Sequence, residues 1–444
     1  MTTSTSASGT HQALVAPPAP AAGAARRTWR RLDERALVLL GTALVALHVA
    51  DDRFLQPPAG TSATDHLAGG LVPMALLAAA AWCHGRARAG WRGLIALTAG
   101  AFGAVIGATE AGYYSVAIGP TGDDFTGLLA IAAGLLLVGV GAATLWRSRR
   151  RDGSLRRRVL RRALLGAAGV VAAVTVAQPV LYAYAVTHIQ RAEVPVDALG
   201  VAHEEVSFTT SDGLRLHGWY IPSRNGAAVV DFPGRLGTQA HARMLARHGY
   251  GVLLFDRRGE GHSEGNGNLL GWGGDKDIIA AVDWLKRQPE VDPRRIGGIG
   301  LSVGGELMLE AAAKDPDLAA VVSDGAGARQ LSEVRLAASG REFWPSSPGW
   351  LGLFGAVSVF SDTAPPASLA ELVPQIAPRP LLFIWAPDGG NKTEVLTPVY
   401  HRLAGPSSSL FAIPDAPHIK GIEAQPRAYE RRVVGFFDEA LLGR

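Results

Sequence analysis

The chain has 444 residues, which is enough for more than one domain. Hydrophobic residues make up 48% of it and charged residues only 18%, a balance typical of a chain with membrane-spanning segments. The net charge is +4, and the arginines gather beside apolar runs, which favours membrane topology over nucleic-acid binding as their explanation. The single cysteine, Cys83, excludes an intramolecular disulfide and argues against a cysteine nucleophile or a zinc cluster.

The first part of the chain is predicted to be a tail followed by a membrane domain. Residues 1–25 are rich in Ser, Thr, Ala and Pro and show no helical or strand period, which predicts a disordered tail. Residues 26–187 form the predicted membrane domain, whose apolar runs reach or approach the length needed to cross about 30 Å of hydrocarbon. Five spans are predicted, the first of them an uncleaved signal anchor that reaches sufficient length only with its flanks: 36–50, 67–83, 93–113, 125–146 and 163–185. Buried core helices are the alternative, but they would not explain why the arginines stop where the apolar runs begin.

Arginine placement predicts the orientation of these spans. Arginines cluster at 26–35, 86–92 and 147–162, whereas loop 51–66 has one and loop 115–124 has none. Short loops rich in Lys and Arg stay in the cytoplasm, so the N-terminus is predicted inside and the C-terminal domain outside. We therefore expect a multi-pass protein of the cell membrane with an extracytoplasmic C-terminal domain.

Glu110 stands near the outward end of the third run. An acid inside a membrane is a functional candidate by default, but the position of Glu110 favours a place at the membrane interface.

Residues 194–444 alternate predicted strands and helices. Helices are expected at 238–249, 275–287, 302–313 and 425–442. Asp212-Gly213 is a good turn pair between the first two strands. This alternation predicts an α/β domain with a mostly parallel sheet covered on both faces. The predicted strands lie in "EEVSFTTSDGLRLHGWYIP" (two strands), "AAVVDF", "GVLLFD", "RIGGIGL", "LAAVVSD", "PLLFIWA" and "SSLFAIP".

Ser302 lies in the sequence Gly300-Leu301-Ser302-Val303-Gly304, where a predicted strand ends and a helix begins. Taken alone, the pattern is equally that of a glycine-rich turn. In a strand–turn–helix it is the setting of a nucleophile elbow, in which glycines permit a sharp turn with the serine at its apex. The helix N-terminus then offers free N–H groups beside a developing negative charge.

A serine hydroxyl needs a base, and the base needs an acid to orient it. His418 follows the last predicted strand, and Asp388 follows the strand before it. The chain order Ser302, Asp388, His418 is that of the α/β-hydrolases. The alternatives are a surface loop histidine at His418 and an Asp-Gly turn residue at Asp388.

The C-terminal domain resembles the α/β-hydrolases, in particular the serine aminopeptidase and monoacylglycerol-lipase-like branch. The segment "FDRRGEGHSEG" is similar to that fold's D-x-R-G-x-G-x-S segment. The run "DKDIIAAVDWLKRQPEVDPRRIGGIGLSVGG" matches the helix and strand that lead to the nucleophile, and "PHIKGIEAQPRAYERRVVGFF" resembles the histidine loop and final helix. The resemblance covers about residues 201–442 and does not extend to the membrane region.

The resemblance also implies oxyanion donors, which are the backbone N–H groups of Val303 and Arg235. The family has His-Gly after the third strand, where this chain reads Phe232-Pro233-Gly234-Arg235. The loop that carries the acid also differs from the family pattern, because Trp385 replaces the glycine of the common G-x-x-D form. Glu394 therefore remains an alternative to Asp388 as the acid.

Residues 327–378 carry several aromatic residues and form either a small cap over the site or an ordinary helical connection. We expect a membrane-anchored serine hydrolase that cleaves carboxylic esters or lipids through an acyl-enzyme. A peptidase or amidase acting on short peptides is the alternative, and a catalytically inactive ligand-binding or sensor domain is the alternative of another class. No metal or organic cofactor is implied. The expected partners are a small ester, lipid or peptide substrate and membrane lipid.

The orientation is tested by alkaline phosphatase fusions, since this reporter is active only outside the cytoplasm. A fusion after Arg444 should be active and a fusion near Ser154 inactive, because the arginine-rich loop at 147–162 resists translocation. An active fusion at Ser154 with a silent one at Arg444 would place the C-terminal domain in the cytoplasm.

Overall fold

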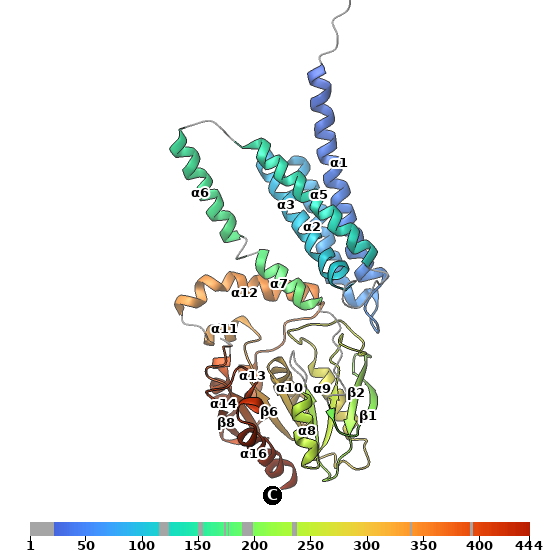
Figure 1. Ribbon diagram of the computed structural model, residues 1–444, viewed down its shortest axis with the longest axis vertical. Helices are drawn as coiled ribbons and strands as arrows, with labels where there is room; N and C mark the ends of the chain where they lie inside the picture. Colours follow the sequence, from blue (N-terminus) through green and yellow to red (C-terminus); the bar gives the residue numbers. More distant parts are fainter. Residues whose placement is uncertain are drawn as a thin grey trace, which may run out of the picture.

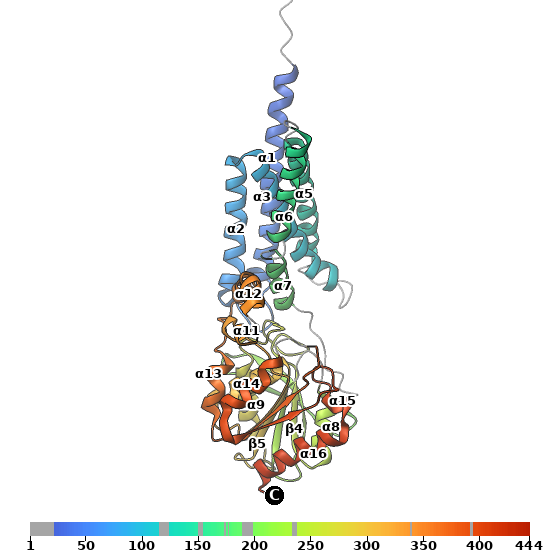
Figure 2. The same ribbon diagram turned by 90° about the vertical axis from the view of Figure 1, so that its left-hand side faces the viewer.

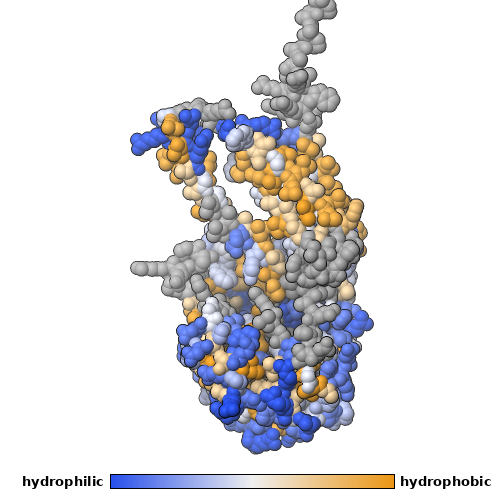
Figure 3. Space-filling view, viewed as in Figure 1, coloured by the Kyte–Doolittle hydropathy of each residue, from blue (hydrophilic) through white to orange (hydrophobic). Residues whose placement is uncertain are grey.

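The computed structural model describes most of the chain as a helical bundle that stands on an α/β domain (Figure 1). The described residues are 22–114, 124–149, 154–172, 175, 177–188, 199–232, 238–337, 340–390 and 394–444. Apolar side chains cover the visible face of the bundle, whereas polar side chains dominate the lower domain (Figure 3). This division agrees with a membrane region joined to a domain that faces water.

The described part of the bundle consists of helices, some of which continue into short π or 3-10 turns. Within the described residues, three helices are long and apolar enough to cross a membrane, namely Ala63–Arg86, Ala89–Ala111 and Phe125–Ser148, and they correspond to the second, third and fourth predicted spans. The first predicted span lies inside α1 and the fifth falls across α6 and α7, and neither belongs to this set of three. The helices are α1 (Ala22–Ala50), α2 (Leu67–Arg86), α3 (Ala89–Gly107), α5 (Asp124–Ser148), α6 (Leu155–Ala172) and α7 (Gln178–Thr187), with the short turns η1 (Asp51–Leu55), η2 (Ala63–His66) and η3 (Ala108–Tyr114).

Glycines allow α3 and α5 to pack closely. A Cβ on Gly134 would lie 2.3 Å from the backbone nitrogen of Ala104, and one on Gly107 would lie 2.4 Å from the carbonyl oxygen of Gly127. Small residues of this kind bring helix backbones together in membranes, where dispersion contacts replace the hydrophobic effect.

The C-terminal domain contains one eight-stranded sheet, and all eight predicted strands are present. The strand order is β1-β2-β4-β3-β5-β6-β7-β8. Strands β1 and β2 pair antiparallel with their neighbours, and the strands from β4 to β8 are parallel. The α/β-hydrolase fold expected from the sequence is thus observed. The strands are β1 (Glu204–Thr209), β2 (Arg215–Ile221), β3 (Ala228–Phe232), β4 (Gly251–Phe255), β5 (Ile296–Leu301), β6 (Ala320–Asp324), β7 (Leu381–Trp385) and β8 (Ser408–Ala412).

Helices cover both faces of the sheet and bury two separate cores. One core packs Ile278 of α9 and Leu307 of α10 on the sheet, and the other packs Leu245 of α8 and Phe437 of α16 on the opposite face. Burial on both faces explains why the central strands read as continuous apolar runs rather than alternating ones. The covering helices are α8 (Gln239–Arg247), α9 (Asp275–Leu285), α10 (Val303–Lys314), α14 (Thr397–Ala404), α15 (Gly421–Ala424) and α16 (Pro426–Phe437), the last continued by η9 (Asp438–Leu442).

The segment that follows β6 connects the sheet to the bundle. It contains α11 (Leu331–Ala337), α12 (Gly340–Phe360), α13 (Leu369–Leu372) and η6 (Val373–Ile376). Helix α12 lies between the bundle and the α/β domain in both views (Figures 1 and 2).

A third core extends from the bundle into the α/β domain. It includes Ile106 at the end of α3, Val357 and Phe360 of α12, and Trp272 from the segment after β4. Hydrogen bonds across the same boundary include those from Gly69 N–H to Asp362 Oδ1, from Leu269 N–H to the Val186 carbonyl and from Gly265 N–H to the Ala59 carbonyl, each at 2.8 Å. The two parts of the molecule are therefore packed against each other.

The segment from Asp256 to Ser263, which matches the family motif, is held by a buried ion pair. Arg258 Nη2 lies 2.7 Å from Asp277 Oδ1, and Arg258 Nη1 lies 3.0 Å from Asp212 Oδ2. Asp277 is fully buried at the start of α9. The arginine of the motif thus fixes the loop after β4 to the helix that leads towards β5.

Arg258→Ala should destabilise the α/β domain by about 3–5 kcal/mol, because it leaves a buried carboxylate without its partner. Thermal unfolding of the detergent-purified protein measures the effect. Arg294→Ala is the matched control, since Arg294 pairs with Asp292 at an exposed surface and should contribute little. Equal effects of the two substitutions would contradict the structural role of Arg258.

Candidate active site

Ser302 occupies the sharp turn between β5 and α10. Its backbone has φ 54° and ψ −120°, a left-handed conformation that is uncommon for a residue other than glycine. The flanking glycines permit the turn, since a Cβ on Gly300 would lie 2.2 Å from the Gly304 carbonyl oxygen. Ser302 N–H donates to the Asp324 carbonyl at 2.7 Å, which ties the turn to the end of β6. The predicted strand–turn–helix at Ser302 is observed.

His418 lies on the loop that follows β8, with its ring directed at Ser302. His418 Nε2 is 2.9 Å from Ser302 Oγ. The backbone of the loop is held by a hydrogen bond from His418 N–H to the Gly389 carbonyl at 3.1 Å. The structure therefore places the predicted base within hydrogen-bonding distance of the predicted nucleophile.

Glu394 supplies the carboxylate that contacts His418. Its Oε2 is 2.6 Å from His418 Nδ1, and its Oε1 accepts the N–H of Ala386 at 2.8 Å. The side chain is 1% exposed, so both carboxylate oxygens depend on these partners. An acid held from two sides in this way fixes the orientation of the imidazole ring.

From the sequence, Asp388 is the residue expected next to His418, but in the structure Glu394 makes this contact. Asp388 lies in the exposed turn that directly follows β7, whereas Glu394 lies six positions further on and begins η7 (Glu394–Leu396). The hydrogen bond from Ala386 N–H draws the Glu394 carboxylate back to the strand end, where it meets the histidine. Glu394, the alternative acid, is thus the one in contact, and its role in catalysis remains a prediction.

Of the two predicted oxyanion donors, the structure describes Val303. Val303 is the first residue of α10, so its N–H has no carbonyl partner within the helix and lies beside the nucleophile. Arg235 belongs to residues 233–237, which lie outside the described residues.

Asp324 is a buried acid beside the site that sequence reasoning missed. It ends β6, and its carboxylate accepts a hydrogen bond from Tyr429 Oη at 2.9 Å. Burial raises the pKa of Asp324 to about 7, and the nearby charge of Glu394 acts in the same direction. Burial therefore disfavours the charged form of Asp324 beside the site. The sequence signal that could have identified Asp324 is its position at the end of a predicted strand, in "LAAVVSDGAG".

Comparison with known proteins gives related sequences over the same region. The family model described as X-Pro dipeptidyl-peptidase (S15 family) matches residues 179–369. Uncharacterized protein Rv2307c of Mycobacterium tuberculosis is 32% identical over 212 residues, which cover 44% of this chain and 75% of that protein. Uncharacterized protein YfhR of Escherichia coli is 27% identical over 258 residues, which cover 54% of this chain and 81% of that protein.

Among solved structures, the Pyrococcus furiosus esterase Pf2001 is similar to this chain with a TM-score of 0.46 and 24% sequence identity. The similarity covers 57% of this chain and 97% of the esterase chain.

Glu394→Gln should lower kcat on the order of 10³- to 10⁴-fold, because an amide holds the imidazole in the wrong tautomer. Asp388→Asn should leave kcat within a few-fold of the wild type, since its carboxylate is exposed in the turn after β7. Steady-state kinetics on one activated ester compare the two variants directly. The reverse ranking would transfer the role of acid to Asp388.

Proposed function

Since this chain is a serine hydrolase and belongs to the same family as the mycobacterial protein Rv2307c, we propose that it is a membrane-anchored hydrolase that cleaves carboxylic esters or lipids through an acyl-enzyme on Ser302. The observation that carries the proposal is the continuous contact from Ser302 Oγ through His418 to Glu394, with distances of 2.9 Å and 2.6 Å. Hydrogen-bonded nucleophile, base and orienting acid form the arrangement that activates a serine hydroxyl.

The proposed mechanism has two halves. Ser302 Oγ attacks the substrate carbonyl while His418 Nε2 accepts its proton, and the resulting oxyanion is bound by the N–H of Val303 and a second donor near Arg235. His418 then gives the proton to the leaving alcohol, and an ester between Ser302 and the acyl group remains. Water repeats the sequence with His418 as the base, which releases the carboxylic acid and restores the serine. Glu394 holds the imidazole ring in place and stabilises the imidazolium in both halves.

The position of Ser302 at the carboxyl ends of the strands supports the proposal of lipid or apolar ester substrates. Ser302 follows β5 at the carboxyl ends of the parallel strands, where ligands bind in open α/β sheets. The segments that leave the same edge after β4 and β6 carry Trp272 and Val357 into the core shared with the bundle. A substrate held in the bilayer would therefore approach this edge along a short path.

Helix α12 adds a second argument for an apolar substrate. The stretch from Phe343 to Ser361 contains no charged residue, and Leu351 is 60% exposed. An uncharged stretch of helix that exposes apolar side chains beside the bundle offers apolar surface to such a substrate.

Short peptides are the second candidate substrate, and the match to the S15 family model favours them. Esters and amides pass through the same tetrahedral intermediate, so the triad does not discriminate between them. A catalytically inactive binding domain is disfavoured by the hydrogen-bonded set of Ser302, His418 and Glu394. The arginine pattern supports an extracytoplasmic position for the α/β domain.

Ser302→Ala should abolish ester hydrolysis, with a loss on the order of 10³-fold or more, while the thermal unfolding temperature stays close to that of the wild type. The assay uses purified full-length protein with p-nitrophenyl esters of increasing chain length and with aminoacyl amides. Faster turnover of the longer esters would support the lipid reading, and a preference for the amides would support the peptidase. A Ser302→Ala variant that keeps most of its activity would refute the nucleophile assignment.

A further inference from the structure

A cluster of buried polar side chains lies at the end of the spans next to the α/β domain. It is built from the end of α1, the end of α3 and the residue that follows α7. Glu110 is 7% exposed and Arg53 is 3% exposed, so the cluster is removed from bulk water. Glu110, which is expected at the membrane interface from the sequence, has a buried side chain. None of these residues belongs to the Ser302 site, and ionisable groups in such a position call for a functional explanation.

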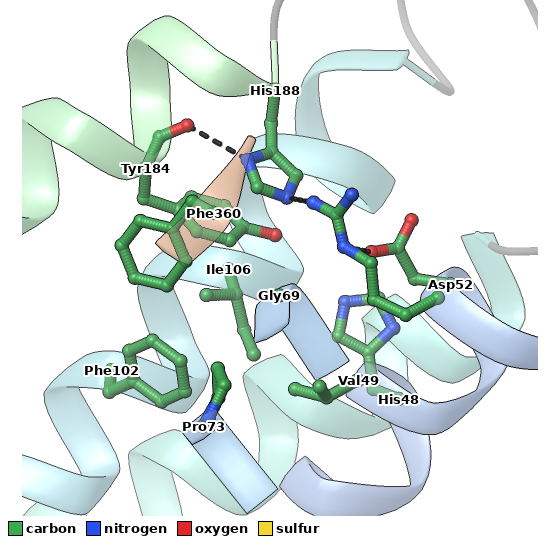
Figure 4. Close-up of a pocket in the computed structure, with 11 residues that line it drawn as sticks. His48, Val49, Asp52, Gly69, Pro73, Phe102, Ile106, Tyr184, His188 and Phe360 are labelled. Carbon is green, nitrogen blue, oxygen red and sulfur yellow. Dashed lines mark hydrogen bonds and ion pairs between the residues drawn. The ribbon is translucent and has the colours of Figure 1, made fainter. Parts of the chain in front are cut away.

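Three of these side chains converge on one point. Asp52, Glu110 and His188 each offer a ligand atom, and the three atoms lie within 4.8 Å of one another. They come from η1, from η3 and from the residue after α7, so the fold brings together positions far apart in the chain. Asp52 and His188 also line a small cavity of about 10 Å³, which Figure 4 shows together with its apolar lining residues Phe102 and Ile106. Glu110 is not among the lining residues, so the ion would sit beside this cavity.

Two of these ligands, His188 and Glu110, make hydrogen bonds to other groups in the way that metal ligands commonly do. His188 Nδ1 lies 3.0 Å from the Tyr184 carbonyl oxygen, and the two rings stack with centroids 3.7 Å apart. A proton on Nδ1 leaves Nε2 as the acceptor, and in this structure Nε2 contacts Arg53 Nη2. Tyr184 Oη also donates to Glu110 Oε1 at 2.6 Å. Metal-binding histidines and carboxylates are held by partners of this kind, which fix their orientation.

The charges of the cluster also call for a cation. Asp52 and Glu110 supply two carboxylates to this cluster, and Arg53 pairs with Asp52. His48 Nε2 lies 3.1 Å from Glu110 Oε2. Two carboxylates beside one arginine leave a negative charge uncompensated in a site of low dielectric constant, where such a charge costs several kcal/mol. A cation held between the two carboxylates would offset this charge.

Arg53 is the competing cation. Its Nε lies 2.9 Å from Asp52 Oδ2, and its Nη2 contacts His188 Nε2. An ion bound by Asp52 and His188 must take these two contacts from the guanidinium, so Arg53 acts as the stand-in when the ion is absent.

We propose that Asp52, Glu110 and His188 bind one divalent transition-metal ion, with zinc as the first candidate. One imidazole nitrogen and two carboxylate oxygens are a donor set that suits zinc. The ion joins the ends of α1 and α3 to the end of α7, and α7 leads to the hydrogen bond between Val186 and Leu269 of the α/β domain. The site thus fastens the bundle to the α/β domain and does not depend on the proposed hydrolysis.

The test measures zinc in the full-length protein after purification in detergent without an affinity tag. Elemental analysis should find about one zinc ion per chain in the protein loaded with zinc and then desalted, and EDTA should lower the unfolding temperature. His188→Asn and Asp52→Asn should lose both the zinc and the response to EDTA. Glu371→Gln, which removes an exposed carboxylate of the α/β domain, is the control and should behave as the wild type.

Two further variants separate a metal site from a purely structural cluster. Tyr184→Phe keeps the ring packing but removes the hydrogen bond to Glu110, and it should weaken zinc binding about 10- to 100-fold. Arg53→Gln should bind zinc as tightly as the wild type or more tightly, because the competing cation is gone. A wild-type protein that binds no zinc and shows no change in unfolding temperature with zinc or EDTA would overturn the proposal and leave Arg53 as the resident cation. Should Arg53→Gln fail to fold, the comparison of His188→Asn with the wild type decides.

Discussion

The left-handed backbone of Ser302 is the constraint on which the geometry of the active site depends. A residue other than glycine in this conformation costs on the order of 1–3 kcal/mol and persists only where its surroundings fix it. Here β5 is buried along its whole length, Gly300 and Gly304 approach each other closely, and the hydrogen bond from Ser302 to Asp324 closes the turn. The packing of the sheet thus holds the hydroxyl at the strand ends, where the loops after β7 and β8 can deliver Glu394 and His418.

The same strand ends also connect the active site to the membrane region. Gly271, in the segment after β4, packs on the side chain of Val303, the expected oxyanion donor. The next residue, Trp272, lies in the core shared with Ile106 of the bundle. One short segment therefore lies between the nucleophile elbow and the core that it shares with the helical bundle. This arrangement gives the bundle a physical link to the site.

The parts of the structure that local pattern decides could be predicted from the sequence. Buried strands read as apolar runs, and the turn at Ser302 follows from glycine spacing between a strand and a helix. The partner of His418 could not be decided in this way. Asp388 stands nearer to its strand, but the conformation of the loop and the hydrogen bond to Ala386 bring the longer Glu394 side chain to the histidine. The contacts of Glu110 could not be predicted from the sequence either, because its partners His48 and Tyr184 lie on helices distant in sequence.

The central claim is that Ser302 is a nucleophile activated by His418. Its most direct test is the reaction of the full-length protein with a fluorophosphonate probe, followed by mass spectrometry of the labelled peptides. We predict a single adduct, on Ser302, and a labelling rate that falls by orders of magnitude in His418→Ala. An unlabelled protein, or a probe attached to a different residue, would contradict the account.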